Sequence, residues 1–85
     1  MNANTVSRKL AAAGFKRSSF SPVKGRGRSR RTDGFQVENN WKGGIEVSVR
    51  DFRPEVATNV HAFVIELGFT EVERMGAFVR YEVAA

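Results

Sequence analysis

The sequence predicts a single small α+β domain over residues 1–85, a two-layer structure in which an antiparallel sheet of about four to five strands carries two helices on one face. Two segments carry apolar residues at helical spacing, and both end in Gly-Phe. Other segments alternate apolar and polar residues, which is typical of strands with one buried face. The predicted order is helix-strand-strand-strand-helix-strand-strand. A hydrophobic fraction of 41% fits a folded domain rather than a disordered chain.

The first helix is predicted over residues 5–13, with Asn4 or Thr5 as its cap. Three apolar residues recur on one face at i, i+4 and i+7: Val6, Leu10 and Ala13. Gly14 provides the left-handed residue that ends such a helix, and an apolar residue follows it.

A strand is predicted next, over residues 16–23, with Phe20 directed inward and Pro22 indicating an edge position. The run Lys-Gly-Arg-Gly-Arg-Ser-Arg-Arg follows at residues 24–31. It has two glycines, no apolar residue and no periodicity. We therefore predict a long mobile loop or hairpin tip, the basic loop 24–32.

An antiparallel hairpin is predicted from residue 35 to residue 50, with turn-forming residues 39–44 at its centre. Its apolar positions alternate with polar ones: Phe35, Val37, Ile45, Val47 and Val49. Trp41 falls in the turn, where it is expected either to cover a thin core or to anchor an interface.

The second helix is predicted to follow Asp51, a potential cap, with Pro54 in its first turn. Its apolar stripe consists of Val56, Val60, Phe63, Val64 and Leu67. It ends in Gly-Phe as the first helix does. This repetition indicates either a common helix-to-strand junction or a pseudo-symmetric pair of helix–strand–strand units.

A closing hairpin is predicted over residues 70–83, with a turn at residues 75–76. Period-2 alternation places Glu71 and Glu73 on one strand face. It places Phe78 and Arg80 on the face opposite the apolar residues of the last strand, where they would form a small stacking or protein-contact patch.

Charge divides the chain into two parts. Residues 1–32 contain nine basic and no acidic residues, whereas residues 33–85 contain five basic and nine acidic ones. A dense cationic segment attached to a body of opposite charge indicates a polyanionic partner, most often nucleic acid. The predicted contact residues, from the basic loop, the first helix and the segment after it, are Lys24, Arg26, Arg28, Arg30, Arg31, Arg8, Lys9, Lys16 and Arg17. The alternatives for the loop are a solvated charged segment and contact with an acidic protein.

Arg26, Arg28 and Arg30 are spaced by two, so an extended backbone would direct all three to one side. Arg26-Gly27-Arg28 resembles the core of AT-hook peptides, which lie in the minor groove of A·T-rich DNA, although Ser29 stands where those peptides have proline. It equally resembles Arg-Gly-rich RNA-binding segments. If all five charges of the run contacted phosphates, the salt slope would be about −4.5.

No enzymatic activity and no cofactor are expected. The chain has no cysteine, a single histidine, no cluster of metal-ligating residues, and no phosphate-binding G-x-x-x-x-G-K-S/T motif. It also lacks an apolar run long enough for a signal peptide or a membrane span. The expectation is a cytoplasmic protein that does not enter a membrane.

The order of motifs is similar to that of short uncharacterised proteins of actinobacteria and their phages: a helix ending Ala-Gly-Phe, a basic strand and loop, Gly-Phe-x-Val, and a helix ending Gly-Phe. That resemblance implies no particular activity. The leading hypothesis is a small accessory protein that binds nucleic acid, DNA or RNA, by electrostatic contact with the phosphate backbone. The alternative is a phage-type inhibitor or adaptor that docks its basic surface on an acidic host protein. A structural protein that neutralises packaged DNA would share the chemistry of the first.

Overall fold

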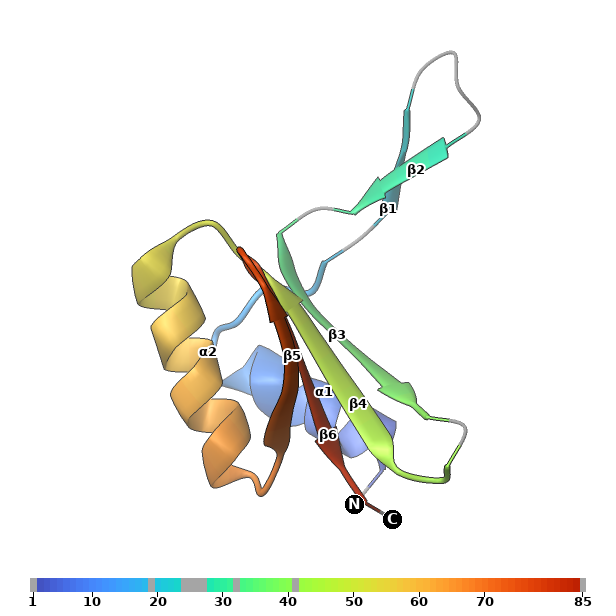
Figure 1. Cartoon of the computed structure of the whole chain (residues 1–85), viewed down its shortest axis with the longest axis vertical. Helices are drawn as coiled ribbons and strands as arrows, with labels where there is room; N and C mark the ends of the chain where they lie inside the picture. Colours follow the sequence, from blue (N-terminus) through green and yellow to red (C-terminus); the bar gives the residue numbers. More distant parts are fainter. Residues whose placement is uncertain (1, 19, 24–27, 32, 41, 85) are drawn as a thin grey trace.

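The structure is a computed structural model, and it describes residues 2–18, 20–23, 28–31, 33–40 and 42–84. The chain forms an α+β domain, as predicted (Figure 1). In chain order the elements are α1 (Ala3–Ala12), β1 (Phe20–Val23), β2 (Arg28–Arg31), β3 (Gly34–Asn39), β4 (Ile45–Arg50), α2 (Pro54–Glu66), β5 (Thr70–Met75) and β6 (Phe78–Val83).

The main sheet has four antiparallel strands in the order β3-β4-β6-β5. β1 and β2 pair only with each other and form a separate two-stranded ribbon, which projects from the body in Figure 1. We call this pair the ribbon. The sequence-based expectation is therefore corrected in one respect, because the strand predicted over residues 16–23 does not join the main sheet. Its second half, Phe20–Val23, is a strand that belongs to the ribbon.

Both helices cover the same face of the main sheet. The buried core combines two residues from each helix, the inward positions of β3, β4 and β6, and Phe69: Val6, Leu10, Phe35, Ile45, Val47, Val49, Val60, Val64, Phe69, Val79 and Tyr81. β4 alternates strictly between buried and half-buried residues, as its period-2 pattern predicts. Each large apolar side chain in this core contributes about 1.5–3 kcal/mol by burial, and the opposite sheet face has no helix over it.

The two helices end in the same way. Gly14 N–H donates to Ala11 O (3.0 Å) and Phe15 N–H donates to Leu10 O (3.2 Å). At the end of α2, the N–H groups of Gly68 and Phe69 make the same two bonds to carbonyls three and five residues back, at 3.0 and 3.3 Å. This is the Schellman arrangement, and it requires a positive φ, which glycine adopts at both positions.

These matching ends divide the body into two similar units, α1–β3–β4 and α2–β5–β6. Each helix precedes a hairpin, and the second strands of the two hairpins, β4 and β6, pair antiparallel at the centre of the sheet. The ribbon lies between α1 and β3 and has no equivalent between α2 and β5. It is therefore an addition to the first unit.

The helix N-termini differ from the predicted caps. Asn2 caps α1, since its side-chain oxygen accepts a hydrogen bond from Thr5 N–H at 2.9 Å. The residue at the N-cap of α2 is Arg53, which makes no side-chain cap bond. Asp51 is instead buried and accepts hydrogen bonds from the backbone N–H of Arg53 (2.9 Å) and from its guanidinium (2.9 and 2.8 Å). Asp51 thus fixes the turn that leads into the helix.

Candidate nucleic-acid interface

The ribbon joins the body at a short parallel bridge. Phe35 N–H donates to Lys16 O (3.0 Å), and Ser18 N–H donates to Phe35 O (2.9 Å), so that Arg17 is paired with Phe35 at the outer edge of β3. The chain enters the ribbon just after this bridge and returns from it at Gly34. Two backbone hydrogen bonds therefore fix the base of the ribbon.

Gly34 makes this close approach sterically possible. Its φ is +136°, and a Cβ built at this position would lie 2.5 Å from Lys16 O and 2.6 Å from Ser18 N. A side chain here would collide with backbone atoms, which cannot move aside as the end of a flexible side chain can. Glycine at position 34 thus allows residues 16–18 to lie against the start of β3.

Arg17 is held at its side-chain end as well as at its backbone. Its Nε–H donates to Ser7 Oγ on α1 at 3.0 Å. The bond joins the middle of the helix to the base of the ribbon, although the two residues are ten positions apart. Because both ends of the side chain are fixed, the guanidinium has a defined position at the surface.

Among the residues whose side chains the structure describes, Arg17 is one of four exposed basic residues without a carboxylate partner: Arg8, Lys9, Lys16 and Arg17. The structure does not gather all four at one place. Lys9 lies two residues beyond Ser7, about 200° around the helix axis, and so belongs to the other flank of α1. Lys16 alternates with Arg17 along an extended segment and is directed to its opposite side. Arg8 directly follows Ser7 on the helix.

The ribbon contains three of the five basic residues in the predicted loop. Its register pairs Arg28 with Val23, Arg30 with Ser21 and Arg31 with Phe20. Positions 28 and 30 therefore belong to one face of the ribbon and position 31 to the other. The prediction of a loop over residues 24–32 is thus wrong for residues 28–31, which form β2. Lys24, Arg26 and Trp41 lie outside the described residues.

In contrast, the arginines of the body are paired with carboxylates. Arg50 lies 3.7 Å from Asp33, and Arg53 lies 2.8 Å from Asp51. Arg74 contacts Glu71. Arg80, on β6, contacts carboxylates from three strands: Glu46 (2.8 Å), Glu82 (3.3 Å) and Glu73 (3.4 Å). These pairs leave little net positive charge on the body.

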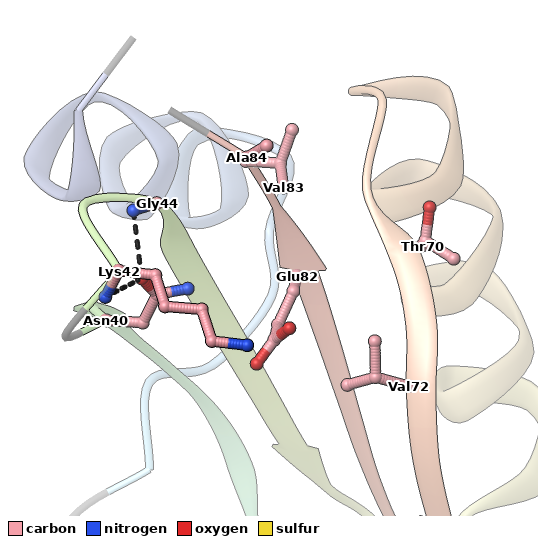
Figure 2. Close-up of a pocket in the computed structure, with 8 residues that line it drawn as sticks. All are labelled: Asn40, Lys42, Gly44, Thr70, Val72, Glu82, Val83 and Ala84. Atoms are coloured by element: carbon pink, nitrogen blue, oxygen red, sulfur yellow. Dashed lines mark hydrogen bonds between the residues drawn. The ribbon is translucent and has the colours of Figure 1, made fainter.

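The sheet face without helices is therefore acidic rather than basic. It carries a polar hollow of about 460 Å³, whose charged lining residues are three acidic and two basic ones: Glu38, Glu46, Glu82, Lys42 and Arg80. Next to it lies a pocket of about 290 Å³ at the end of the sheet, where Figure 2 shows Lys42 extending toward Glu82. Because the carboxylates outnumber the cations in this hollow, it offers no net positive charge to a phosphate backbone. The acidic face was missed in the sequence, although its residues occupy the polar positions of the alternating strands.

A second polar contact lies under α2. The hydroxyl of Tyr81, a buried residue, is 2.9 Å from His61 Nδ1, and Glu71 Oε1 lies 3.8 Å from the same nitrogen. Burial raises the pKa of Tyr81. His61 and Tyr81 border a cleft of about 200 Å³ between α2 and β6. The sequence indicated only that His61 lies on the flank of a helix, because its partner is 20 residues away.

Across the described ranges, no group of three or more His, Asp or Glu side chains is arranged to hold a metal ion. No helix in the same ranges is long and apolar enough to cross a membrane. Comparisons with protein-family models, with curated proteins and with solved structures gave no match. The functional argument therefore depends on the charges and geometry of this chain.

Proposed function

We propose that this protein binds nucleic acid through the ribbon and the base from which it projects, and that it acts as a cytoplasmic accessory protein rather than an enzyme. The observation that carries the proposal is the difference in charge compensation. Body arginines are paired with carboxylates, whereas Arg8, Lys9, Lys16 and Arg17 have none among the described residues. A cation without an internal partner is available to an external anion.

The shape of the ribbon supports the same proposal. A two-stranded antiparallel ribbon is narrow enough to enter the major groove of B-DNA, which is about 12 Å wide. In this proposal the arginines at positions 28 and 30 follow one side of the groove, and Lys24, Arg26 and Arg31 add further phosphate contacts. The contacts are mainly with phosphates, so affinity depends on salt more than on sequence.

The test is fluorescence anisotropy with labelled duplex DNA, single-stranded DNA and RNA, each at several salt concentrations. We expect binding that weakens steeply with salt, and the preferred probe identifies the ligand. In a variant with Arg26, Arg28, Arg30 and Arg31 replaced by Ala, the slope should flatten by about 0.9 for each phosphate that the protein no longer neutralises. The free energy of unfolding should change by less than about 1 kcal/mol, because surface charges contribute little to folding. No binding of any probe at 50 mM salt would reject the proposal.

A ribbon-deleted variant provides a second test. A Gly/Ser linker of about six residues between Ser18 and Asp33 spans roughly 13 Å and would leave both αββ units intact. We expect this variant to fold and to lose most of its affinity. A variant that cannot fold would show that the ribbon supports the body, and the arginine replacements would then decide the function.

The second candidate is a basic surface that docks on an acidic protein, as in a phage-type inhibitor. Exposed apolar residues favour it: Phe52, Met75 and Ile65 are 66%, 68% and 41% exposed. Phe78, on the sheet face opposite the core, is half-buried and less accessible. If this candidate is right, Met75→Ser would weaken partner binding, whereas it should not affect nucleic-acid binding.

A further inference from the structure

We propose that Arg17 and Ser7 form a clamp for one backbone phosphate at the base of the ribbon. This inference rests on the proposed nucleic-acid function and adds a defined contact to it. It makes Arg17 different in kind from the other unpaired cations, because its side chain is positioned before the ligand arrives.

The backbone of Arg17 is fixed by the bridge to Phe35, whose two hydrogen bonds measure 2.9 and 3.0 Å. The other end of the side chain is fixed by the 3.0 Å bond from Nε to Ser7 Oγ. Ser7 itself stands on α1, between the buried residue Val6 and the exposed Arg8. Fixing a long side chain in this way reduces the rotamer entropy that is lost when a ligand binds.

The groups that remain available on this pair are hydrogen-bond donors. The Nη1 and Nη2 atoms of Arg17 have no acceptor within the described ranges, and neither has the hydroxyl hydrogen of Ser7. The two guanidinium nitrogens form the planar fork that binds two oxygens of one anion. Ser7 lies at the Nε edge of the guanidinium, away from this fork, so it orients the fork and does not itself contact the bound anion. A backbone phosphate offers two oxygens at the spacing of this fork.

The position of the clamp agrees with a phosphate of a longer backbone. Arg17 lies one residue before the point where the chain leaves the body for the ribbon. A duplex whose groove holds the ribbon would therefore have its phosphates close to the ribbon's base. The clamp would set how deeply the ribbon enters, as backbone contacts commonly fix the register of a protein on nucleic acid.

The first experiment uses inorganic phosphate alone and does not require nucleic-acid binding. In ¹H–¹⁵N spectra, we expect the Arg17 Nε–H signal to shift saturably with phosphate, and we expect sodium chloride at equal ionic strength to have a much smaller effect. Ser7→Ala should weaken the phosphate effect about fivefold, which corresponds to one net hydrogen bond. The matched control is Thr58→Ala, which removes a helix hydroxyl on α2 and should leave the titration unchanged.

The second experiment measures nucleic-acid affinity. Ser7→Ala removes no charge, so it should weaken binding about fivefold while the salt slope stays the same. Arg17→Lys should behave similarly, because the charge remains while the Nε bond and the fork are removed. A Ser7→Ala variant with wild-type affinity, an Arg17 signal that does not respond to phosphate, or a response to sodium chloride as large as that to phosphate would each overturn the clamp. Failure of the wild-type protein to bind any nucleic acid would instead overturn the proposed function.

Discussion

Glu71 and Glu73 are two residues apart on β5, yet they face opposite sides of the sheet. Glu71 pairs with Tyr81 across the strands and Glu73 with Arg80, because a bulge interrupts the register between them. Glu71 consequently contacts Arg74 on the helix side, while Glu73 lies 3.4 Å from Arg80 on the acidic face. The period-2 expectation that both share one face is wrong.

The bulge also affects an exposed edge of the sheet. β5 is the last strand of the order, and all six of its residues are exposed. Charged side chains and a bulge on such an edge disfavour pairing with a second chain. The arrangement thus limits edge-to-edge association of the sheet.

Replacement of Arg80 by Met is expected to destabilise the protein. It would leave Glu46, Glu73 and Glu82 facing one another without the cation that holds them together. We expect the free energy of unfolding to fall at low salt and to fall less at high salt, because salt screens the remaining repulsion. Urea unfolding at two salt concentrations measures both values. Arg74→Met, which removes a cation with a single partner, is the control and should cost less.

Tyr81 is expected to titrate above the usual range. Burial raises its pKa above 10.0, the value of an exposed tyrosine. The folded state therefore holds this proton more tightly than the unfolded state. The contribution of protonated Tyr81 to the free energy of unfolding is fully present below pH 10. It is lost as the pH rises through the pKa of Tyr81 in the folded protein. Tyr81 is the only tyrosine of the chain, so tyrosinate absorbance reports it alone. A midpoint near 10 in the native protein would contradict its burial.

Asp51 should make stability depend on pH at the acidic end. The hydrogen bond from the Arg53 guanidinium lowers the pKa of this buried carboxyl below 3.8. The contribution of the ionised Asp51 carboxylate to the free energy of unfolding is present above pH 3.8. It is lost as the pH falls through the pKa of Asp51 in the folded protein. We expect Asp51→Asn to cost about 1–3 kcal/mol at pH 7, the size of a hydrogen bond to a charged group, and to cost less in acid. The control is Asp33→Asn, whose carboxylate makes one 3.7 Å contact with Arg50. A constant cost for Asp51→Asn at all pH values would contradict this account.

Gly34→Ala should be more damaging than Gly14→Ala. The Cβ at position 34 would meet Lys16 O at 2.5 Å, and the backbone conformation is unfavourable for alanine. We expect a loss of more than about 2 kcal/mol by urea unfolding. Gly14→Ala provides the matched control. It also has a positive φ, of +94°, but its Cβ would have nothing within 4 Å, so about 1 kcal/mol is expected. Equal losses at the two sites would show that the contact with residues 16–18 does not constrain the fold.

Strong periodicity is what made most of the fold predictable. The alternation over residues 45–50 and the apolar stripe of α2 report burial directly, and the Gly-Phe pairs mark both helix ends. β2 could not be found in this way. Arg28–Arg31 contains no apolar residue, so a method that depends on apolar spacing has nothing to detect. Its partner strand, not its own pattern, makes it extended.

The candidate interface was predictable in composition but not in geometry. The sequence shows which residues are basic, yet it does not show which of them are neutralised. Arg80 contacts Glu46, which lies 34 positions away. Likewise, the bond between Arg17 and Ser7 depends on how the chain turns after α1. Ion pairing between distant positions follows from the fold, and only the structure distinguishes paired from unpaired cations.

The ribbon belongs to the first αββ unit only, and this difference affects the charge of the chain as well as its architecture. Residues 16–33 contain seven of the fourteen basic residues and one of the nine acidic ones. Without them the chain would carry seven basic and eight acidic residues, and its net charge would change from +5 to −1. This short insertion thus changes the net charge of the chain from slightly negative to positive. A related protein without it would be expected to bind an anion exchanger rather than a cation exchanger at neutral pH.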